Sequence, residues 1–395
     1  MRPLTRSSHS CPFAYAFAFA FAFALPYNTP MIRLGTYAVL PLLLLACSSV
    51  ADSSSGDTGP DTVDSTTELS VQDLHLETAM EVASEVLEVL PPYPNDHRLL
   101  LTHVQMEGTH NSYHKWPPPG TNIPDYLYEM PPLEQQLATH GVRQFEIDIH
   151  RDAQTDELLV YHAPVFDAET TCKDLPACLT RMKLWSDLNL GHHALVVMIE
   201  PKDDVALANL EGRYDLIEDN ILQVWPRDRI IAPDDVRGTH PDLRTAVLED
   251  GWPTLGQSRD KILFVLLDSG LHRDLYLAES PDLADRLIFP LAKDVDEYFA
   301  AFLAMDGPVG DFHRIQEAVE LGFMVRTRSD SDPHLPVDMQ RIQAAIDSGA
   351  NCLSTNFPGP TEQQDWHLEI PQGTPSRCNP ISAPAWCTSA DIENL

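Results

Sequence analysis

The sequence predicts an α/β fold: a single (β/α)8 barrel of the TIM type. Beyond residue 98, short apolar runs rich in β-forming residues alternate with stretches that suit helices or long loops. Eight such runs are present, and eight parallel strands close this type of barrel. An open flavodoxin-like sheet is the alternative, but no glycine-rich phosphate-binding turn follows the first run.

These runs define the expected elements in chain order. The expected strands are 101–106, 142–149, 158–161, 195–199, 262–267, 298–304, 323–327 and 352–355. The run 298–304 is the least typical of a strand. The expected helices are 132–139, 174–187, 205–223, 313–320 and 338–348. Asp174 and Asp338 stand where a side chain can cap the first turn of a helix.

The composition argues against several classes of function. The 395-residue chain has a formal net charge of -33, and 43% of its residues are hydrophobic. The apolar fraction is enough for a sizeable core. The acidic balance argues against nucleic-acid binding through a basic face and against broad electrostatic attraction to anionic membranes. We expect a monomer.

The first 97 residues resemble targeting and linker segments. We interpret residues 1–30, a low-complexity string, as a spurious or untranslated extension. Residues 31–47 resemble a bacterial lipoprotein signal peptide cleaved before Cys47, whose thiol would carry the lipid; an ordinary secretory signal is the alternative. Residues 48–97 are acidic and rich in Ser and Thr, which predicts a disordered tether. We therefore expect an exported protein, either anchored to a membrane or secreted.

Export also bears on the cysteines, because an oxidising compartment permits disulfides. We expect a barrel over 98–370 and a C-terminal tail over 371–395. The expected pairs are Cys172 with Cys178, which flank a turn, and Cys378 with Cys387 in the tail. Cys352 lies in an apolar run and is expected to be a buried free thiol.

Four short polar motifs stand at or just beyond the ends of predicted strands. They are His110-Asn111, Glu146-Ile-Asp148, His162 and Glu200-Pro-Lys202. The functional groups of such a barrel gather at the carboxyl ends of its strands. We take His162 to close the third barrel strand and Glu200 the fourth. If consecutive strands are neighbours, all four motifs meet on one side of the barrel mouth.

The chemistry of these motifs suits a divalent cation beside a phosphodiester. Glu146 and Asp148 are two residues apart and share one face of a strand, where buried acids are costly without a cation. Three carboxylates and an amide oxygen favour Ca2+ over Zn2+, and Mg2+ usually demands stricter geometry. Two imidazoles can move protons near neutral pH.

The region 101–357 resembles the calcium-dependent phosphatidylinositol-specific phospholipase C family in these motifs. The resemblance implies that His110 and His162 are catalytic, and it assigns the Ca2+ ligands to Asn111, Glu146, Asp148 and Glu200. In that family the inositol 2-hydroxyl attacks phosphorus, diacylglycerol leaves, and a cyclic inositol phosphate forms that water can open. Lys202 is expected to contact a phosphate oxygen of the substrate, and an ion pair with Glu200 is the alternative. Arg326 and Arg328 are also expected to contact the substrate, and structural salt bridges are the alternative. Asn356 stands where we expect an acidic residue in relatives.

Two other functions remain open at this point. A glycerophosphodiester phosphodiesterase uses a similar barrel, but it typically has His-Arg in place of His110-Asn111 and an Asp directly after its second His, where this chain has Ala163. A surface lipoprotein that binds phosphosugars without turnover would not need both imidazoles. We expect the partners to be a phosphatidylinositol-type lipid and a membrane surface.

Two further groups of residues lie outside these four motifs. His192 and His193 look like zinc ligands, but they precede a strand and should lie at the opposite end of the barrel. Trp116, Tyr126 and Tyr128 lie in a proline-rich loop after the first strand. They either pack over the barrel mouth or reach a membrane interface.

Overall fold

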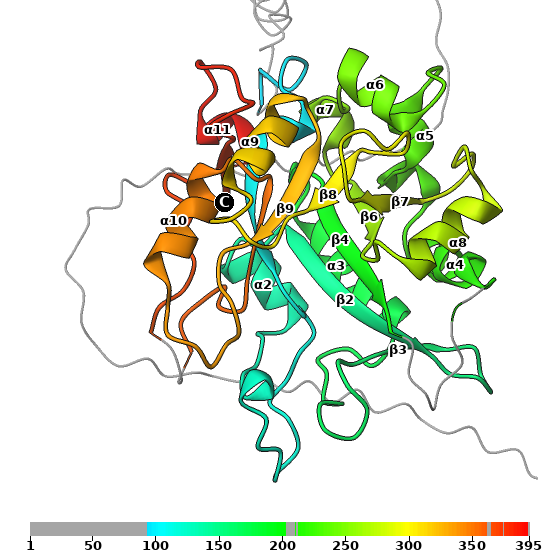
Figure 1. Cartoon of the computed structure of the whole chain (residues 1–395), viewed down its shortest axis with the longest axis vertical. Coiled ribbons are helices and arrows are strands. Elements are labelled where there is room, and N and C mark those ends of the chain that lie inside the picture. The colour runs from blue at the N-terminus through cyan, green and yellow to red at the C-terminus, as the bar shows by residue number, and fades with distance from the viewer. Residues whose placement is uncertain (1–92, 203–209, 211, 362–364, 374, 394–395) are drawn as a thin grey trace, which may run out of the picture. The chain divides into compact units, whose positions relative to one another are not determined.

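The structure is a computed structural model that describes residues 93–202, 210, 212–361, 365–373 and 375–393. The expected leader, signal peptide and residues 48–92 of the tether lie outside these residues. Eight parallel strands form a closed barrel, confirming the predicted fold (Figure 1). They are β1 (Val104–Thr109), β2 (Gln144–Arg151), β4 (Leu195–Pro201), β6 (Ile262–Leu266), β7 (Ile288–Ala292), β8 (Phe302–Ala304), β9 (Met324–Arg328) and β10 (Cys352–Thr355). Pairing of β1 with both β10 and β2 closes the ring.

One predicted barrel strand is wrong. The run 158–161 does form a strand, β3 (Leu158–Val160), but β3 pairs antiparallel with β2 outside the barrel. Parallel neighbours need a long crossover, and residues 152–157 are too few to supply one. A hairpin is therefore the only short connection. His162 consequently follows a hairpin strand and does not close a barrel strand, and Glu200 ends the third barrel strand.

The barrel strand that replaces it, β7, was not predicted. β7 carries Pro290 at its centre, and proline usually argues against an interior strand because it cannot donate to a neighbouring strand. The ladder accommodates Pro290 because β7 pairs with β6 through residues up to Pro290 and with β8 from Leu291 onward. The run 298–304, expected as a strand, contributes only its end as β8.

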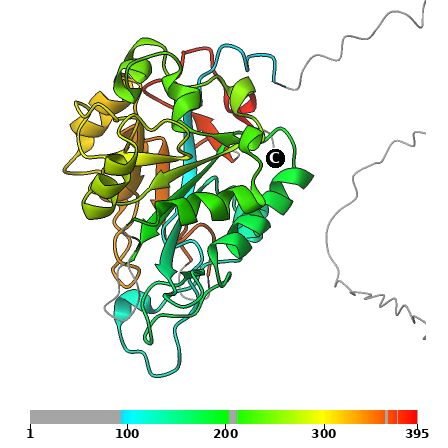
Figure 2. The same ribbon diagram turned by 90° about the vertical axis from the view of Figure 1, so that its right-hand side faces the viewer.

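Helices cover the barrel on its outside, as Figure 2 shows from the side. They are α2 (Leu133–Thr139), α3 (Leu175–Leu188), α4 (Tyr214–Val224), α5 (Pro233–Arg237), α6 (Leu243–Glu249), α7 (Leu255–Ser258), α8 (Leu271–Glu279), α9 (Phe312–Glu320) and α10 (Met339–Asp347), with α11 (Ser389–Ile392) near the C-terminus. Asp174 and Asp338 cap α3 and α10 as predicted, each accepting from backbone N–H groups of the first turn. The described part of the expected helix 205–223 is α4.

The remaining short elements are three 3-10 turns and two strands outside the ring. They are η1 (Leu101–His103), η2 (Pro124–Tyr126), η3 (Arg227–Arg229), β5 (Ile230–Ile231) and β11 (Ser376–Cys378). A continuous core fills the barrel and the space beneath the helices, with Phe264, Phe289 and Trp225 fully buried. Within the described residues, no helix has the length and apolar character needed to cross a membrane.

The C-terminal residues belong to the same packed unit. β11 pairs antiparallel with β1, and both expected disulfides, Cys172–Cys178 and Cys378–Cys387, are present. Cys352 is buried and free, as expected. Near the chain end, the Glu393 carboxylate forms a buried ion pair with Arg143 at the start of β2. The tail therefore seals the amino-terminal end of the barrel, opposite its mouth.

Candidate active site

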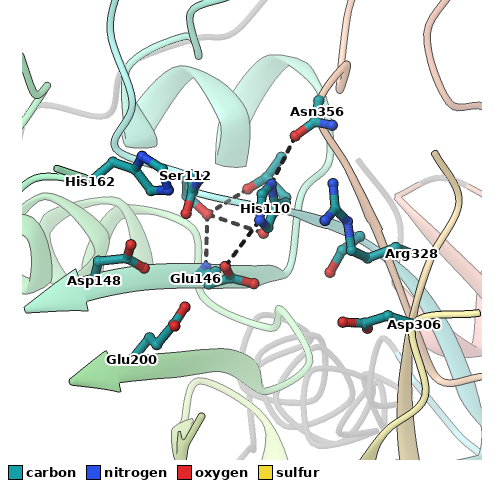
Figure 3. Close-up of polar contacts among 12 residues, drawn as sticks. His110, Ser112, Glu146, Asp148, His162, Glu200, Asp306, Arg328 and Asn356 are labelled. Atoms are coloured by element: carbon teal, nitrogen blue, oxygen red, sulfur yellow. Dashed lines mark hydrogen bonds and ion pairs between the residues drawn. The ribbon is translucent and has the colours of Figure 1, made fainter. Parts of the chain in front are cut away.

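Three carboxylates meet at the carboxyl ends of two neighbouring barrel strands (Figure 3). Glu146 and Asp148 lie on β2, and Glu200 lies on β4, which pairs with β2 so that Asp148 is level with Glu200. One oxygen from each carboxylate lies within 4.8 Å of the other two. The alternation of strand side chains explains this convergence: residues two apart face the same side, and the register aligns the two strands.

The acid cluster is poor in hydrogen bonds for its burial, which fits a cation-binding site. Burial raises the pKa of Glu146 and raises that of Asp148 strongly, and the charge of Glu200 adds to both effects. Neither oxygen of Asp148 accepts a well-directed hydrogen bond from a described residue. Buried carboxylates in this state need an added positive charge to ionise. Oxygen donors of this kind suit Ca2+.

Lys202 supplies part of that charge from within the chain. Its Nζ lies 2.6 Å from Glu200 Oε1 and 3.2 Å from Asp148 Oδ2. Burial lowers the pKa of Lys202, but the two carboxylates outweigh it and the net pKa is raised. The ammonium group is therefore charged and stands between two of the acids that a metal ion would use.

Asn111 and Ser112 lie in the loop after β1, and Ser112 joins this loop to β2. Asn111 adopts a left-handed backbone (φ 48°), a conformation that Asn tolerates better than most residues. Its side chain is buried and donates to the Tyr128 hydroxyl at 3.2 Å. Ser112 pairs with the backbone of Glu146: its N–H donates to the Glu146 carbonyl, and its Oγ accepts from the Glu146 N–H. This double link fixes the loop beside β2.

His110 lies between Glu146 and Asn356, and its tautomer follows from the contacts of Asn356 (Figure 3). Asn356 Nδ2 donates to Asp330 Oδ1 (3.1 Å) and to the Ser331 carbonyl (2.8 Å), so Oδ1 of the amide faces His110. His110 Nδ1 must then donate to Asn356 Oδ1, at 2.9 Å. His110 Nε2 keeps its lone pair in the neutral ring and lies 3.5 Å from Glu146 Oε1.

Charge and burial keep His110 neutral. Burial lowers the pKa of His110 well below its usual value, and the positive charges of Arg328 and Arg326 lower it further. The hydrogen bond to Asn356 opposes this shift without reversing it. An amide in place of a carboxylate at this position thus leaves the imidazole without a strong stabiliser for its protonated form.

His162 lies beside a carboxylate, whereas His110 lies beside an amide. Its Nδ1 lies 2.9 Å from Asp167 Oδ2, and the same oxygen lies 2.9 Å from Nε2 of His114. Burial raises the pKa of Asp167, but the two imidazoles outweigh this and lower it. Asp167 is therefore an anion in contact with both imidazoles. Tyr128 stacks on His114 at 4.0 Å and Tyr126 packs edge-on against His162, so this part of the loop packs over the mouth.

The two predicted arginines have different roles. Arg326 is buried and every arm of its guanidinium is engaged: Nε with Ser354, Nη1 with Asp306 and Nη2 with Glu146 at 2.6 Å. Arg328 makes one weaker bond to the Ser331 carbonyl, and its Nε has no partner among the described residues. Arg326 thus orients Glu146, whereas Arg328 retains donors for a ligand.

A cavity of about 370 Å3 opens over this arrangement. It is lined by His110, Glu146, Glu200, Leu267, Asp268, Ser269, Leu291, Ala304, Asp306, Arg326 and Arg328. A cavity of this size can hold a polyhydroxylated ring. His162 and Asp148 lie on the other side of His110 and Glu146 in Figure 3. The structure thus brings together the residues predicted from all four motifs.

Three acids of this region were not predicted. The carboxylates of Asp167, Asp330 and Asp306 form hydrogen bonds with His162, Asn356 and Arg326, respectively. Asp306 and Asp330 follow predicted strands, at 298–304 and 323–327, so their position was the available signal. Asp167 gave no such signal, because the turn that returns it to His162 is irregular. His192 and His193 pack at the opposite end against Ser186 and Ser376, as their structural interpretation predicted.

The sequence and the fold of this chain are similar to those of known phospholipases C. The family model for Ca2+-dependent phosphoinositide phospholipase C matches residues 153–380, more than half of the chain. The fold is similar to a calcium-dependent phosphoinositol-specific phospholipase C from the Gram-negative bacterium Pseudomonas sp. (TM-score 0.50, 19% identity, 68% of this chain and 95% of that chain). It is also similar to a Ca2+-dependent phosphatidylinositol-specific phospholipase C from Streptomyces antibioticus (TM-score 0.49, 18% identity, 66% and 95%). No curated protein sequence matches significantly.

Proposed function

Because the chain belongs to the family of Ca2+-dependent phosphoinositide phospholipases C, we propose that it cleaves the phosphodiester of a phosphatidylinositol-type lipid. The products would be diacylglycerol and a cyclic inositol phosphate, or inositol phosphate after ring opening. One observation supports this proposal above the others. Two imidazoles with different partners, His110 beside the Asn356 amide and His162 beside the Asp167 carboxylate, lie next to a carboxylate cluster at the barrel mouth.

We propose that the carboxylate cluster holds Ca2+. Glu146, Asp148 and Glu200 supply the charged oxygens. Asn111, which precedes the Ser112 that bonds to the Glu146 backbone, would add its amide oxygen. The fit rests on the under-bonded, buried Asp148 and on the raised pKa values of the acids. When bound, Ca2+ would act as a Lewis acid toward phosphate oxygens and favour ionisation of a coordinated hydroxyl.

The two imidazoles would divide the proton transfers between them. His110 Nε2, with its free lone pair and low pKa, takes the proton from the inositol 2-hydroxyl. The hydroxyl oxygen then bonds to phosphorus while the bond from phosphorus to the glycerol oxygen breaks. His162, whose Nδ1 lies 2.9 Å from Asp167 Oδ2, gives a proton to that leaving oxygen. Arg328 would contact a phosphate oxygen or ring hydroxyl, and Lys202 a phosphate oxygen released from the acids.

The loops around the mouth support action at a membrane. The loop after β1 and the loop after β3 project from the same end of the barrel (Figure 1) and are joined by the bond from Thr121 Oγ1 to the Phe166 carbonyl. At the tip of the second loop, Val165 is 78% and Phe166 59% exposed. Trp116, Ile123 and Leu127 are also exposed on the first loop. We propose that these five side chains, the apolar rim, enter the lipid interface.

We propose that the protein reaches this surface by export and lipidation of Cys47. The proposal is supported only by the residues around that cysteine, which lie outside the described part of the chain. Metabolic labelling with radioactive palmitate tests it. Label should enter the wild-type protein and be lost in Cys47→Ser. Equal labelling of the variant would contradict lipidation at this residue.

The function is tested by turnover on defined inositol lipids. The purified chain is assayed on phosphatidylinositol vesicles and on water-soluble glycerophosphoinositol, with EDTA and after return of Ca2+ or Mg2+. We expect Ca2+-dependent release of diacylglycerol, with His110→Ala and His162→Ala each lowering kcat by at least about a thousandfold. If Mg2+ but not Ca2+ restored activity, the assignment of Ca2+ would be wrong. Water attack on glycerophosphoinositol without a cyclic product would instead indicate a glycerophosphodiesterase.

A further inference from the structure

A second cavity, of about 600 Å3, lies on the outside of the barrel and shares no residue with the cavity at the mouth. It is enclosed by β1, the end of α2 and residues 367–373, which follow β10 in place of a helix. Gln105 on β1 bonds to the backbone at Ile346 and Ala350, so its face of the strand points outward. Glu107, two residues on, shares that face and lines the cavity.

Glu107 is the unusual residue of this cavity. It is only 6% exposed, and its Oε1 has no hydrogen-bond partner among the described residues. Burial raises the pKa of Glu107 well above its usual value, and the charge of Glu369 raises it further. A buried acid that folding leaves unsatisfied calls for a partner from outside the chain.

The groups around Glu107 are acids and imidazoles. Glu369 lies at the open side, with Oε1 3.2 Å from Nε2 of His367. His367 Nδ1 is buried and has no partner among the described residues. His140 packs directly on Gly359, where an added Cβ would lie 2.2 Å from the imidazole. No Lys or Arg is among the described lining residues.

These features favour a cationic organic ligand over a metal ion. Two carboxyl groups share the cavity without a cationic side chain, so an ammonium group would relieve both. The metal-ligating atoms here do not converge: among the described residues, the only cluster within metal-binding reach is the one at the mouth. The volume instead suits a molecule the size of a monosaccharide. Pro358, Leu368 and Pro371 offer apolar walls for the faces of a ring.

We propose that this outer cavity binds a small hydroxylated amine of the amino-sugar class. Its ammonium group would donate to Glu107 and Glu369, and its hydroxyls would bond to His140 and His367. The site is separate from the mouth, and the proposal does not depend on the catalytic function proposed above. It assigns a ligand to a deeply buried carboxyl group that the proposed mechanism does not use and whose Oε1 has no hydrogen-bond partner among the described residues.

Thermal unfolding of the full chain with matched sugars tests this proposal. Glucosamine at 10 mM should raise Tm by about 2–4 °C, whereas N-acetylglucosamine and glucose, which lack the charge, should not. Glu107→Gln should abolish the shift. Glu134→Gln, the same change at the exposed ion pair with Arg181, should keep it.

The proposal would be overturned by no shift with glucosamine, by an equal shift with N-acetylglucosamine, or by a full shift in Glu107→Gln. A shift lost in Glu146→Gln but kept in Glu107→Gln would place the sugar at the mouth and also contradict it. If Glu107→Gln failed to fold, calorimetric titration of glucosamine into Glu369→Gln would decide, with at least fivefold weaker binding expected. Turnover of glycerophosphoinositol reports on the mouth independently and should be unchanged in Glu107→Gln.

Discussion

At the scale of single residues, the two imidazoles differ through what holds them. His110 is held by an amide that Asp330 orients, and His162 by the carboxylate of Asp167. A neutral partner suits a base and an anionic partner suits an acid. This division of roles could not be read from the sequence, because both partners are distant in the chain or return through an irregular turn.

The first prediction concerns Asp167. Asp167→Asn removes the negative charge beside His162 Nδ1 while keeping the size of the side chain, and we expect kcat to fall by about 100- to 10,000-fold. Steady-state turnover of glycerophosphoinositol or phosphatidylinositol measures it. Asp125→Asn, at an exposed ion pair with His334, is the control and should retain activity. Full activity in Asp167→Asn would contradict the role of His162 as acid.

The second prediction concerns Lys202. Its ammonium group stands beside Asp148 and Glu200, so Lys202→Met should tighten Ca2+ binding by about tenfold, because a like charge leaves the site. Calorimetric titration of Ca2+ measures the affinity, and turnover should fall as a phosphate contact is lost. Lys183→Met, at the exposed pair with Asp187, should change neither. Weaker Ca2+ binding in Lys202→Met would show that Lys202 supports the metal site.

At the scale of elements, the turn between β3 and α3 joins two exposed apolar side chains to His162 and Asp167. Ala163 and Asp167 pair as a bridge, and Val165 between them has φ 71°, a strained backbone for a β-branched residue. Val165 and Phe166 are both exposed at the tip of this turn. His162 and Asp167 stand at the base of the same turn, so the apolar tip is anchored in the site.

The third prediction tests this tip. The double change Val165→Ser with Phe166→Ser should lower partitioning onto phosphatidylcholine vesicles, which are not a substrate, by about tenfold. Vesicle sedimentation measures it. Leu188→Ser is the control: it is 84% exposed at the last residue of α3, the end of the helix away from this turn. Equal loss in both proteins, or none in either, would contradict the rim.

The sequence predicted most elements correctly, and its errors have identifiable causes. Alternating and continuous apolar runs located seven of the eight barrel strands, and helix caps located α3 and α10. β7 was not predicted because it contains Pro290, and proline is rare inside strands. The connection 152–157 is too short for a parallel crossover, which excludes β3 from the barrel. The acid cluster was predictable because strand alternation puts Glu146 and Asp148 on one face, and because the carboxyl ends of parallel strands meet at one end of a barrel. Contacts made by long loops were not.

At the scale of the whole molecule, the two ends of the barrel have different tasks. The mouth carries the acids, imidazoles and apolar rim. The opposite end is sealed by the tail, where Arg143 bonds to Glu393 and to the Leu137 carbonyl and lies over the Trp185 ring. His193 N–H also donates to Glu393. A buried ion pair between Arg143 and Glu393 thus closes the end of the barrel opposite the candidate site.

The fourth prediction concerns this seal. Glu393→Gln leaves Arg143 buried without its anion and should lower the free energy of unfolding by about 3 kcal/mol, measured by urea denaturation. Asp296→Asn, at an exposed pair with Arg244, should cost less than about 1 kcal/mol. If Glu393→Gln were as stable as the wild type, the ion pair with Arg143 would not stabilise this end of the barrel.

The same ion pair predicts a pH dependence. Burial raises the pKa of Glu393, but Arg143 and His193 outweigh it and the folded-state pKa lies below 4.5. The unfolded state therefore takes up the proton first as pH falls. The stabilisation is present above the unfolded pKa and is lost as pH falls through the folded one. Between pH 6 and pH 3, the wild type should lose more stability than Glu393→Gln, and parallel losses would contradict this.

The central claim is that buried acids hold Ca2+ beside two imidazoles that act on an inositol phosphodiester. Phosphorus NMR of phosphatidylinositol micelles with the purified chain tests it most directly. With Ca2+ present, the lipid signal should give way to that of a five-membered cyclic phosphodiester, and chelation with EDTA should stop the conversion. Conversion that continues in EDTA, or an acyclic phosphate that forms without any cyclic intermediate, would contradict the account.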